Sequence, residues 1–255
     1  MSQSSDGHDE PIGLIGGIGL TEVRVYAQRT APDGLFSGCP HVHAVTDEAY
    51  FVLQGSGAVE FHDLDNGYRK LPLEVGQYVH FPPLVMHRLI SDGDLVILGM
   101  MGNAGLAERG EARIYFGRAV DENPARFDEL QTLPKRLGLE GALQRRDEAV
   151  RAYQHLMHLW NTNRLLYRGE LERFFEVHQR AMSKIADTLL EQVKNGPLAW
   201  GELTRARIAS LRKNESPAAP PRVASIAMNR RTSGESALGM CGVLRPILSL
   251  EKFRS

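Results

Sequence analysis

Two hydrophobic periodicities divide the chain. Up to about residue 117, short apolar runs alternate with turn-forming segments such as Asp65-Asn66-Gly67 and Ser91-Asp92-Gly93. Short strands at even spacing with turn residues between them are typical of a β-sandwich or β-barrel. The pattern predicts strands over 12–20, 22–28, 48–54, 57–63, 68–74, 77–81, 87–91, 94–101 and 112–117, with a short helical excursion over 104–109.

From residue 123 on, the period becomes helical. Asn123-Pro124 is a helix-start signal. Two apolar stripes follow, divided by Arg168-Gly169, which favours an antiparallel helical pair, with one kinked helix as the alternative. The stripes consist of Leu143, Val150, Tyr153, Met157, Trp160 and Tyr167, and of Leu171, Phe174, Phe175, Met182, Ile185, Leu189 and Val193. Asn195-Gly196-Pro197 is a stop signal, and a third helix is expected over 198–213.

These patterns predict an α+β protein with four segments. A disordered N-terminus over 1–11 precedes an antiparallel β-barrel over 12–120, and a helical hairpin or bundle follows over 121–215. Residues 216–255 are rich in Pro, Arg and Ser and indicate a linker and a loosely ordered tail. Within that tail, residues 238–250 are apolar enough to pack onto another part of the chain.

The two halves of the chain carry opposite net charges, which bears on the partners that we expect. Residues 1–120 hold 8 Lys/Arg and 15 Asp/Glu, a net of −7, whereas residues 121–255 hold 22 and 16, a net of +6. An acidic barrel with a basic appendage can dock against itself or against a second copy, so a homodimer is one expectation; the alternative is that these are solvated helix faces. Nucleic-acid binding is disfavoured, because the basic residues are interleaved with acids and no binding motif accompanies them.

Composition points to a cytoplasmic protein. The hydrophobic content of 42% and charged content of 24% are ordinary for a globular chain. Only Cys39 and Cys241 occur, far apart in sequence, which argues for a reduced compartment over a disulfide scaffold. The N-terminal residues do not resemble a secretory signal, and no apolar run reaches the ~18 residues of a membrane span, so no membrane partner is expected.

The candidate chemistry lies in residues 38–87. His41 and His43 alternate, so in a strand their side chains share one face. Glu48 opens the next predicted strand, and His87 follows a proline turn. Three neutral imidazoles and one carboxylate suit Mn, Fe, Co, Ni or Zn. The sequence therefore predicts one divalent transition metal ion held by these four residues.

The spacing of these residues resembles the two-motif signature of the cupins. The pattern G-x6-H-x-H-x4-E-x6-G runs from Gly34 to Gly55, and G-x5-P-x4-H follows from Gly76 to His87. Leu84 stands where a glycine is common in the family, so the turn before His87 is expected to differ in shape. The resemblance covers about residues 12–118 and implies a double-stranded β-helix barrel in which His41, His43, Glu48 and His87 are the metal ligands.

Cupins with this ligand set include dioxygenases, sugar-phosphate isomerases and proteins without known turnover, so the fold alone leaves the reaction open. The first hypothesis is a metal-dependent, dioxygenase-like enzyme acting on a small polar molecule. A sugar-phosphate isomerase is the next alternative. The third is a non-catalytic cupin that binds a small molecule and passes its state to a partner through the helices.

Tyr50 and Arg88 are the candidate catalytic residues. Tyr50 shares the face of Glu48, so it either touches substrate or fills the cavity. Arg88 follows His87 and should point away from the metal, unless the nearby proline turn redirects it toward an anionic substrate.

The remaining candidates have simpler explanations. Cys39 is expected to be a small buried thiol. Tyr78 and His80 share a strand face and either line the pocket or pack elsewhere, while His62 is expected to be exposed. Two further histidines on the predicted helix, His155 and His158, have no carboxylate at ligand spacing, which favours surface or packing roles.

Overall fold

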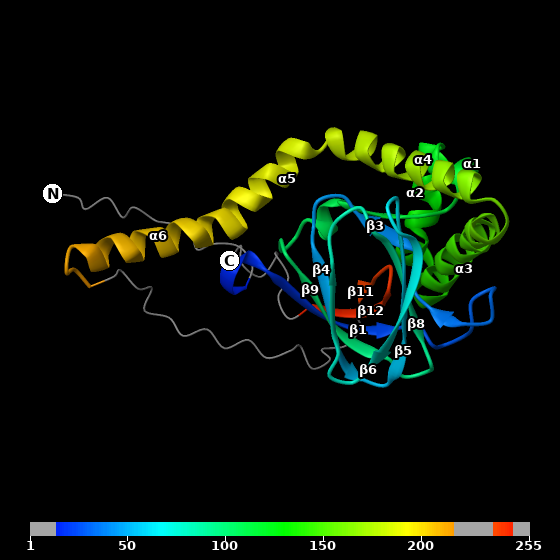
Figure 1. Cartoon of the computed structure of the whole chain (residues 1–255), viewed down its shortest axis with the longest axis horizontal. Coiled ribbons are helices and arrows are strands. Elements are labelled where there is room, and N and C mark those ends of the chain that lie inside the picture. Colours follow the sequence, from blue (N-terminus) through cyan, green and yellow to red (C-terminus); the bar gives the residue numbers. More distant parts are fainter. Residues whose placement is uncertain (1–13, 217–236, 247–255) are drawn as a thin grey trace.

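The computed structural model describes residues 14–216 and 237–246 (Figure 1). The predicted disordered N-terminus at 1–11 and most of the predicted tail therefore lie outside the described residues.

Two antiparallel sheets face each other and form the barrel (Figure 1). The first has the strand order β11-β12-β1-β9-β4-β7 and the second β10-β3-β8-β5-β6, with β2 pairing to β8. The strands are β1 (Gly19–Val25), β2 (Phe36–Ser37), β3 (His41–His43), β4 (Glu48–Gln54), β5 (Ser56–Asp63), β6 (Gly67–Glu74), β7 (Tyr78–Phe81), β8 (Met86–Ser91), β9 (Val96–Met101), β10 (Ala112–Ile114), β11 (Ala237–Leu238) and β12 (Gly242–Pro246).

Alternation along β4 sets which side chains enter the barrel. Glu48, Tyr50 and Val52 are buried, whereas Phe51 is 37% and Leu53 43% exposed. The strand is half-buried as its pattern predicts, and the face that carries Glu48 is the inner one. Tyr50 and Val52 on this inner face pack into the core between the two sheets. The core also includes Val23, Phe61, Leu73, Phe81, Leu89 and Ile97.

The structure merges the first two predicted strands into one. A single 3₁₀ turn, η1 (Ile15–Gly17), precedes β1, and the bend expected at Gly16-Gly17 is present, with φ values of 78° and 80°. Both values lie in the left-handed region that favours glycine. A second 3₁₀ turn, η2 (Ala107–Arg109), lies within the predicted helical excursion.

The expectation of a tail after residue 216 is wrong for residues 237–246. β12 pairs antiparallel with β1, from Gly242 opposite Val25 to Pro246 opposite Thr21, and so extends the first sheet. The segment approaches closely: a Cβ built on Gly38 would lie 2.7 Å from the Cα of Cys241. Glycine is therefore required at position 38 for this contact. The apolar character of residues 238–250 anticipated packing, but not a strand.

Six α-helices follow the barrel strands within residues 118–212: α1 (Arg118–Asp121), α2 (Pro124–Gln131), α3 (Leu133–Thr162), α4 (Arg164–Ser183), α5 (Ala186–Val193) and α6 (Ala199–Arg212). Asn123 caps α2 as predicted, accepting a hydrogen bond from the Arg126 N–H. The helical pair breaks at Asn163 and not at Arg168-Gly169. Asn163 has extended backbone angles, and its side chain accepts from the Leu166 N–H, so it caps α4.

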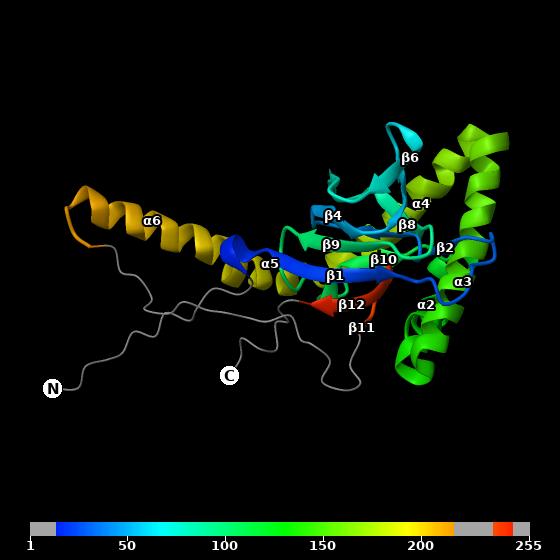
Figure 2. The same ribbon diagram turned by 90° about the horizontal axis from the view of Figure 1, so that it is seen from below.

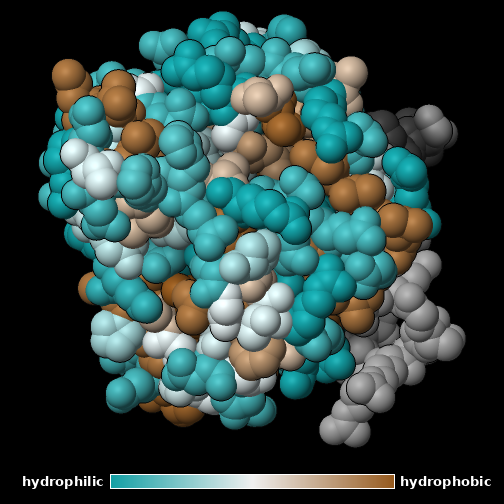
Figure 3. Space-filling view, turned by 90° about the vertical axis from the view of Figure 1, so that its right-hand side faces the viewer, coloured by the Kyte–Doolittle hydropathy of each residue, from teal (hydrophilic) through white to brown (hydrophobic). Residues whose placement is uncertain are grey.

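Helices α3 and α4 cover one side of the barrel (Figure 1). Their apolar residues, including Tyr153, Leu156, Leu171 and Phe174, pack with Val42, Met86 and Tyr115 of the barrel side. The outward face on this side of the molecule is mainly hydrophilic with scattered apolar residues (Figure 3). This is the arrangement expected of amphipathic helices that bury one stripe.

Helices α5 and α6 lead away from the barrel and α6 contains no buried residue (Figures 1 and 2). The turn η3 (Lys194–Leu198) joins them at the predicted stop signal. Among the described residues, no helix has the length and apolar character needed to cross a membrane.

Candidate metal centre

Three strands bring four donors together inside the barrel. His41 and His43 lie at the two ends of β3, Glu48 begins β4, and His87 lies on β8 directly opposite His41 in the strand register. All four residues are buried, and one ligand atom from each lies within 4.8 Å of the others. The sequence spacing and the sheet register therefore bring together the four residues that were predicted as a ligand set.

The contacts within the group are short. The Nε2 atom of His87 lies 3.0 Å from Nε2 of His41 and 3.1 Å from Oε2 of Glu48. The Nε2 atom of His43 lies 3.3 Å from the same carboxylate oxygen. All three imidazoles thus direct Nε2 toward one common point beside Glu48.

The opposite nitrogen of each imidazole is held from outside the group. Nδ1 of His41 donates to the Cys39 carbonyl at 2.9 Å, and Nδ1 of His87 donates to the Val85 carbonyl at 3.0 Å. A carbonyl can only accept, so in the neutral rings Nδ1 carries the proton and both Nε2 lone pairs face each other. Two lone pairs 3.0 Å apart require a shared proton or a cation between them, which is how the donor set fits a metal ion.

His43 is oriented by a carboxylate that the sequence did not single out. Glu111, completely buried, accepts from Nδ1 of His43 at 2.7 Å and from the N–H groups of Val45 and Thr46 at 2.7 and 3.0 Å. A carboxylate behind a ligating histidine fixes its ring orientation and increases its basicity. Nothing in the local pattern marked Glu111, because its partner lies 68 residues away.

The titration behaviour follows from burial and from these contacts. Burial and the two neighbouring imidazoles lower the pKa of His41 well below its usual range. Burial opposes the charged form of His43, but hydrogen bonds to Glu111 and Glu48 outweigh it and raise its pKa to about 10. For Glu48, burial is outweighed by the interactions with the neighbouring His87 and His43 imidazoles, so its pKa is lowered. The group therefore presents an anionic carboxylate beside a neutral His41.

A cavity of about 610 Å³ opens onto this group. His41, His43 and Glu48 line it together with Cys241, and most of its other walls are apolar. The apolar walls include Ile18, Leu20, Val23, Met101, Met240 and Leu244. A concave, mainly apolar space with a few convergent polar groups is the usual form of a small-molecule site.

Comparisons with known proteins agree with this arrangement. Residues 28–100 match the cupin domain family. The barrel is a cupin domain. No curated protein matches the chain.

Solved cupin and sugar-isomerase structures resemble parts of the chain. The TDP-fucose-3,4-ketoisomerase WlaRA from Campylobacter jejuni is 14% identical, with a TM-score of 0.30, over 36% of this chain and 64% of that protein. A putative sugar phosphate isomerase from Acidithiobacillus ferrooxidans is 24% identical, with a TM-score of 0.26, over 33% and 49%. A cupin-2 domain protein from Shewanella frigidimarina is 20% identical, with a TM-score of 0.27, over 39% and 82%. These likenesses are too distant to carry an argument about activity.

The turn before His87 departs from the family sequence at Leu84. Leu84 has a φ of 60°, in the left-handed region where glycine is favoured. Its N–H donates to the His43 carbonyl at 2.8 Å, which ties this turn to β3. In this turn a leucine therefore adopts a backbone conformation that glycine usually adopts. The expected difference in turn shape from the family stays a prediction.

Tyr50 and Cys241 lie beside the metal group. Tyr50 is fully buried, its hydroxyl has no hydrogen-bond partner among the described residues, and burial and the charge of Glu48 raise its pKa well above its usual value. The Cys241 Sγ lies 3.5 Å from Nε2 of His41. No local pattern marked Cys241 as a neighbour of the histidines, because it belongs to a segment that was expected to be a tail.

Arg88 does not reach the cavity, and its possible catalytic role is not supported by the geometry. Its side chain is 1% exposed and extends from β8 toward helix α3. Nη2 donates to Asp33 and to the Ser37 hydroxyl, both at 2.7 Å, and the guanidinium lies 5.0 Å from the ring centre of Tyr153. Strand alternation decides this, because His87 points inward and its neighbour must point out.

His62 is fully buried, so the expectation that it is exposed is wrong. It lies where α3 and α4 cover β5, a contact that the strand pattern alone does not reveal. Tyr167 donates to Nδ1 at 2.8 Å, and Nε2 donates to the Tyr153 hydroxyl at 2.7 Å. The Tyr153 hydroxyl in turn donates to Glu60 at 2.9 Å. Burial requires a neutral His62, and in that form each donor of this chain has an acceptor.

We expect this requirement to make the fold sensitive to acid. Burial lowers the pKa of His62 to about 3, against about 6.5 in an unfolded chain. The unfolded state binds the proton more readily, so stability falls as the pH drops below about 6.5, by on the order of 2 kcal/mol between pH 7 and pH 5. Urea unfolding at both pH values should show a smaller loss for His62→Gln, which cannot titrate. An equal loss in both proteins would contradict this role.

The remaining sequence candidates are outside the metal centre. Cys39 is fully buried, as expected. His155 and His158 are exposed on α3. Tyr78 and His80 lie on the outer face of β7, where Tyr78 is 58% exposed.

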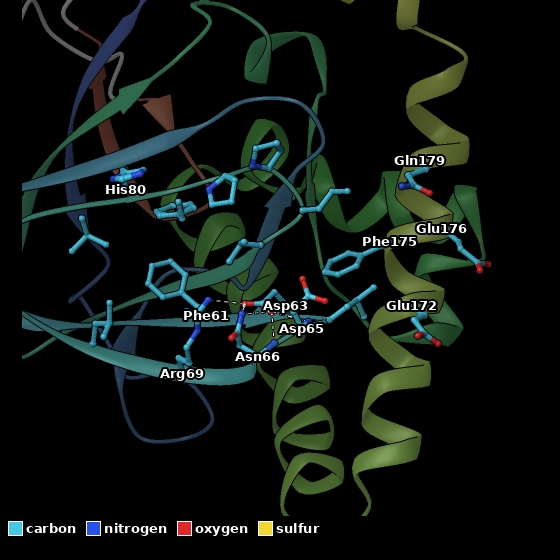
Figure 4. A pocket seen from close by; sticks show the side chains of 18 residues that line it. Phe61, Asp63, Asp65, Asn66, Arg69, His80, Glu172, Phe175, Glu176 and Gln179 are labelled. Carbon is cyan, nitrogen blue, oxygen red and sulfur yellow. Dashed lines mark hydrogen bonds and ion pairs between the residues drawn. The ribbon is translucent and has the colours of Figure 1, made fainter.

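A second cleft of about 670 Å³ lies between the barrel and α4 (Figure 4). Its labelled polar residues include Asp63, Asp65, Glu172 and Glu176, and Arg69 lies 2.6 Å from Asp63. None of the four donors lines this cleft. It is therefore separate from the metal centre.

Proposed function

We propose that this cupin is a metal-dependent, dioxygenase-like enzyme acting on a small organic molecule. The observation that supports it is the convergence of His41, His43, Glu48 and His87 beside a cavity with mostly apolar walls. One divalent transition metal ion, of which Fe, Mn, Co, Ni and Zn all suit this donor set, would bind to these four side chains.

A bound metal of this kind would supply Lewis-acid polarisation and, for a redox-active ion, access to oxygen chemistry. The protein contributes the arrangement around it. Glu111 and the Cys39 and Val85 carbonyls fix the imidazole rings, so the donors are held in place before a ligand arrives. The apolar wall formed by residues such as Met101 and Leu244 excludes water from the space that a substrate would occupy.

The apolar walls also favour oxygenase chemistry over sugar isomerisation. A sugar presents a hydroxyl on nearly every carbon, and each buried hydroxyl needs a hydrogen-bonding partner. The cavity's polar side chains outside the donor set are outnumbered by apolar residues and glycines; they are Thr21, Asn103, Glu108, Gln131, Thr132, Lys135 and Arg145. Isomerisation also needs a group that moves protons, and the lining carboxylate outside the donor set, Glu108, is exposed at its edge.

The test determines which reaction the protein catalyses and which metal ion supports it. The full-length protein, loaded in turn with Fe(II), Mn(II), Co(II), Ni(II) or Zn(II), is screened for oxygen uptake with a panel of small organic acids and for isomerisation with a panel of sugar phosphates. We expect oxygen uptake with a redox-active ion and no isomerisation. Isomerisation would favour the second hypothesis, and metal binding without either reaction would favour a non-catalytic small-molecule binder.

A homodimer and a cytoplasmic location stay predictions. Exposed apolar side chains on and beside β4, β6 and β7 fit a dimer, because apolar surface can mark an interface. They are Phe51, Leu53, Leu71, Val75 and Tyr78.

A further inference from the structure

One buried arginine that lines the metal cavity has no ion-pair partner among residues 14–216 and 237–246. Arg88, Arg145, Arg146 and Arg173 are the buried arginines among the described residues. Arg88 pairs with Asp33 at 2.7 Å, Arg146 with Asp147 at 2.7 Å and Arg173 with Asp121 at 3.0 Å. Arg145 forms no ion pair within the described part of the chain, although it is only 6% exposed. A buried cation without an anion is costly, so its presence needs an explanation.

The contacts of Arg145 are to neutral groups. Its Nη2 donates to the carbonyls of Gly239 at 2.6 Å and Leu238 at 3.2 Å, and Nη1 donates to that of Gln131 at 3.5 Å. Its buried Nε has no hydrogen-bond partner among the described residues. These contacts attach the β11–β12 turn to α3, but they leave both the positive charge and one donor unsatisfied.

Arg145 lines the same cavity as the metal group. Gly239, which binds its guanidinium, lies two residues before Cys241, whose Sγ is 3.5 Å from His41. Two residues span at most about 7 Å, so the chain position that binds the guanidinium and the one that contacts His41 are close neighbours on the wall of one cavity. A small elongated molecule can therefore reach both. Lys135, exposed at the cavity, adds a second positive charge on the same helix.

We propose that the ligand of this cavity is a small organic carboxylate whose anionic group binds Arg145 and whose apolar body lies against Met101 and Leu244. The guanidinium matches a carboxylate in charge, and Nη1, whose one contact is the 3.5 Å bond to the Gln131 carbonyl, provides the donor. The inference rests on the proposed use of this cavity as a substrate site, and it assigns the substrate class that the four metal-group donors leave open.

The test compares two probes of the same length, hexanoate and hexan-1-ol, by ligand-observed NMR titration of the full-length protein. We expect hexanoate to bind about tenfold more tightly than hexan-1-ol, since hydrogen bonds to a charged group are stronger than neutral ones. Arg145→Gln keeps donors for the Gly239 carbonyl but removes the charge, and it should abolish this preference while hexan-1-ol still binds. Arg151→Met, an exposed position on the same helix, should leave the preference unchanged.

His87→Ala separates this inference from the proposed function. If the carboxylate binds Arg145, the preference persists in His87→Ala, even if the protein shows no oxygen uptake. If the preference is lost in His87→Ala and persists in Arg145→Gln, the carboxylate binds at the metal group and the inference is wrong. No preference in the unmodified protein would also overturn it.

A second readout covers the case in which Arg145→Gln does not fold. In the unmodified protein labelled with ¹⁵N-arginine, the Nε–H resonance of Arg145 should shift with hexanoate and not with hexan-1-ol. Arg145→Lys, which keeps the charge, assigns that resonance by its absence. An Arg145 resonance unaffected by hexanoate would contradict the proposal.

Discussion

His87→Ala is expected to weaken metal affinity by more than about 100-fold, since removing a ligand costs at least as much as removing its supporting contacts. The Nε2 atom of His87 lies 3.0 Å from that of His41 and 3.1 Å from Oε2 of Glu48, so an ion bound by these residues would contact all three. The alanine variant loses one of four donors and leaves a space that water can fill. Elemental analysis after dialysis against a fixed low metal concentration measures the change.

The matched control is His155→Ala, an exposed helix histidine that has no role in the centre. It should retain the full metal content of the unmodified protein. Circular dichroism should show both variants folded, because the core around the centre is formed by both sheets and does not depend on one imidazole. Equal metal retention in His87→Ala and His155→Ala would remove His87 from the ligand set.

Arg88→Met is expected to lower the free energy of unfolding by about 3 kcal/mol or more. The guanidinium is 1% exposed and lies 2.7 Å from Asp33 and 3.6 Å from Glu60. Methionine fills much of the same volume but leaves Asp33, Glu60 and the Ser37 hydroxyl without their positive partner. Removing one member of a buried charge group costs more than the group contributes as a whole, because the other members remain buried and uncompensated. Urea unfolding at pH 7 measures the difference.

Arg69→Met provides the exposed comparison. Arg69 lies 2.6 Å from Asp63, but its side chain is 50% exposed, so water screens the pair. Its replacement should cost no more than about 1 kcal/mol. If the two variants were equally stable, burial would not determine the cost of removing Arg88 from its ion pairs.

The sequence could predict the four-residue group because two local rules determine it. Alternation places His41 and His43 on one strand face, and turn residues mark where the neighbouring strands carrying Glu48 and His87 begin. The structure brings these four residues together. Most strand ranges agree for the same reason, since a two-residue period is visible in a short window.

Contacts between distant segments could not be predicted in this way. Glu111, Cys241 and Arg145 each reach the cavity or its histidines from a segment far along the chain, and none has a local pattern that distinguishes it. His62 is buried only because α3 and α4 cover its strand. Residues 238–250 were expected to pack, but the strand over 237–246 could not be predicted, because its partner β1 lies near the other end of the sequence.

The boundary between α3 and α4 was hard to predict because two local signals, a glycine and a capping asparagine, indicated different positions. Glycine at 169 indicated a break, yet Gly169 lies inside α4, where the cost of one glycine is only about 1 kcal/mol. Asn163 ends α3 and caps α4 through its own side chain. A cap that satisfies a free N–H was the stronger signal, and the apolar stripes alone did not identify it.

The central claim is that four buried donors hold one transition metal ion. Elemental analysis of the full-length protein, purified without chelators and without a metal-affinity column, tests it most directly. We expect about one transition metal ion per chain, lost on treatment with a chelator and regained on adding the same ion. A chain that contains no metal as purified, and whose melting temperature does not change when Fe, Mn, Co, Ni or Zn is added, would contradict the claim.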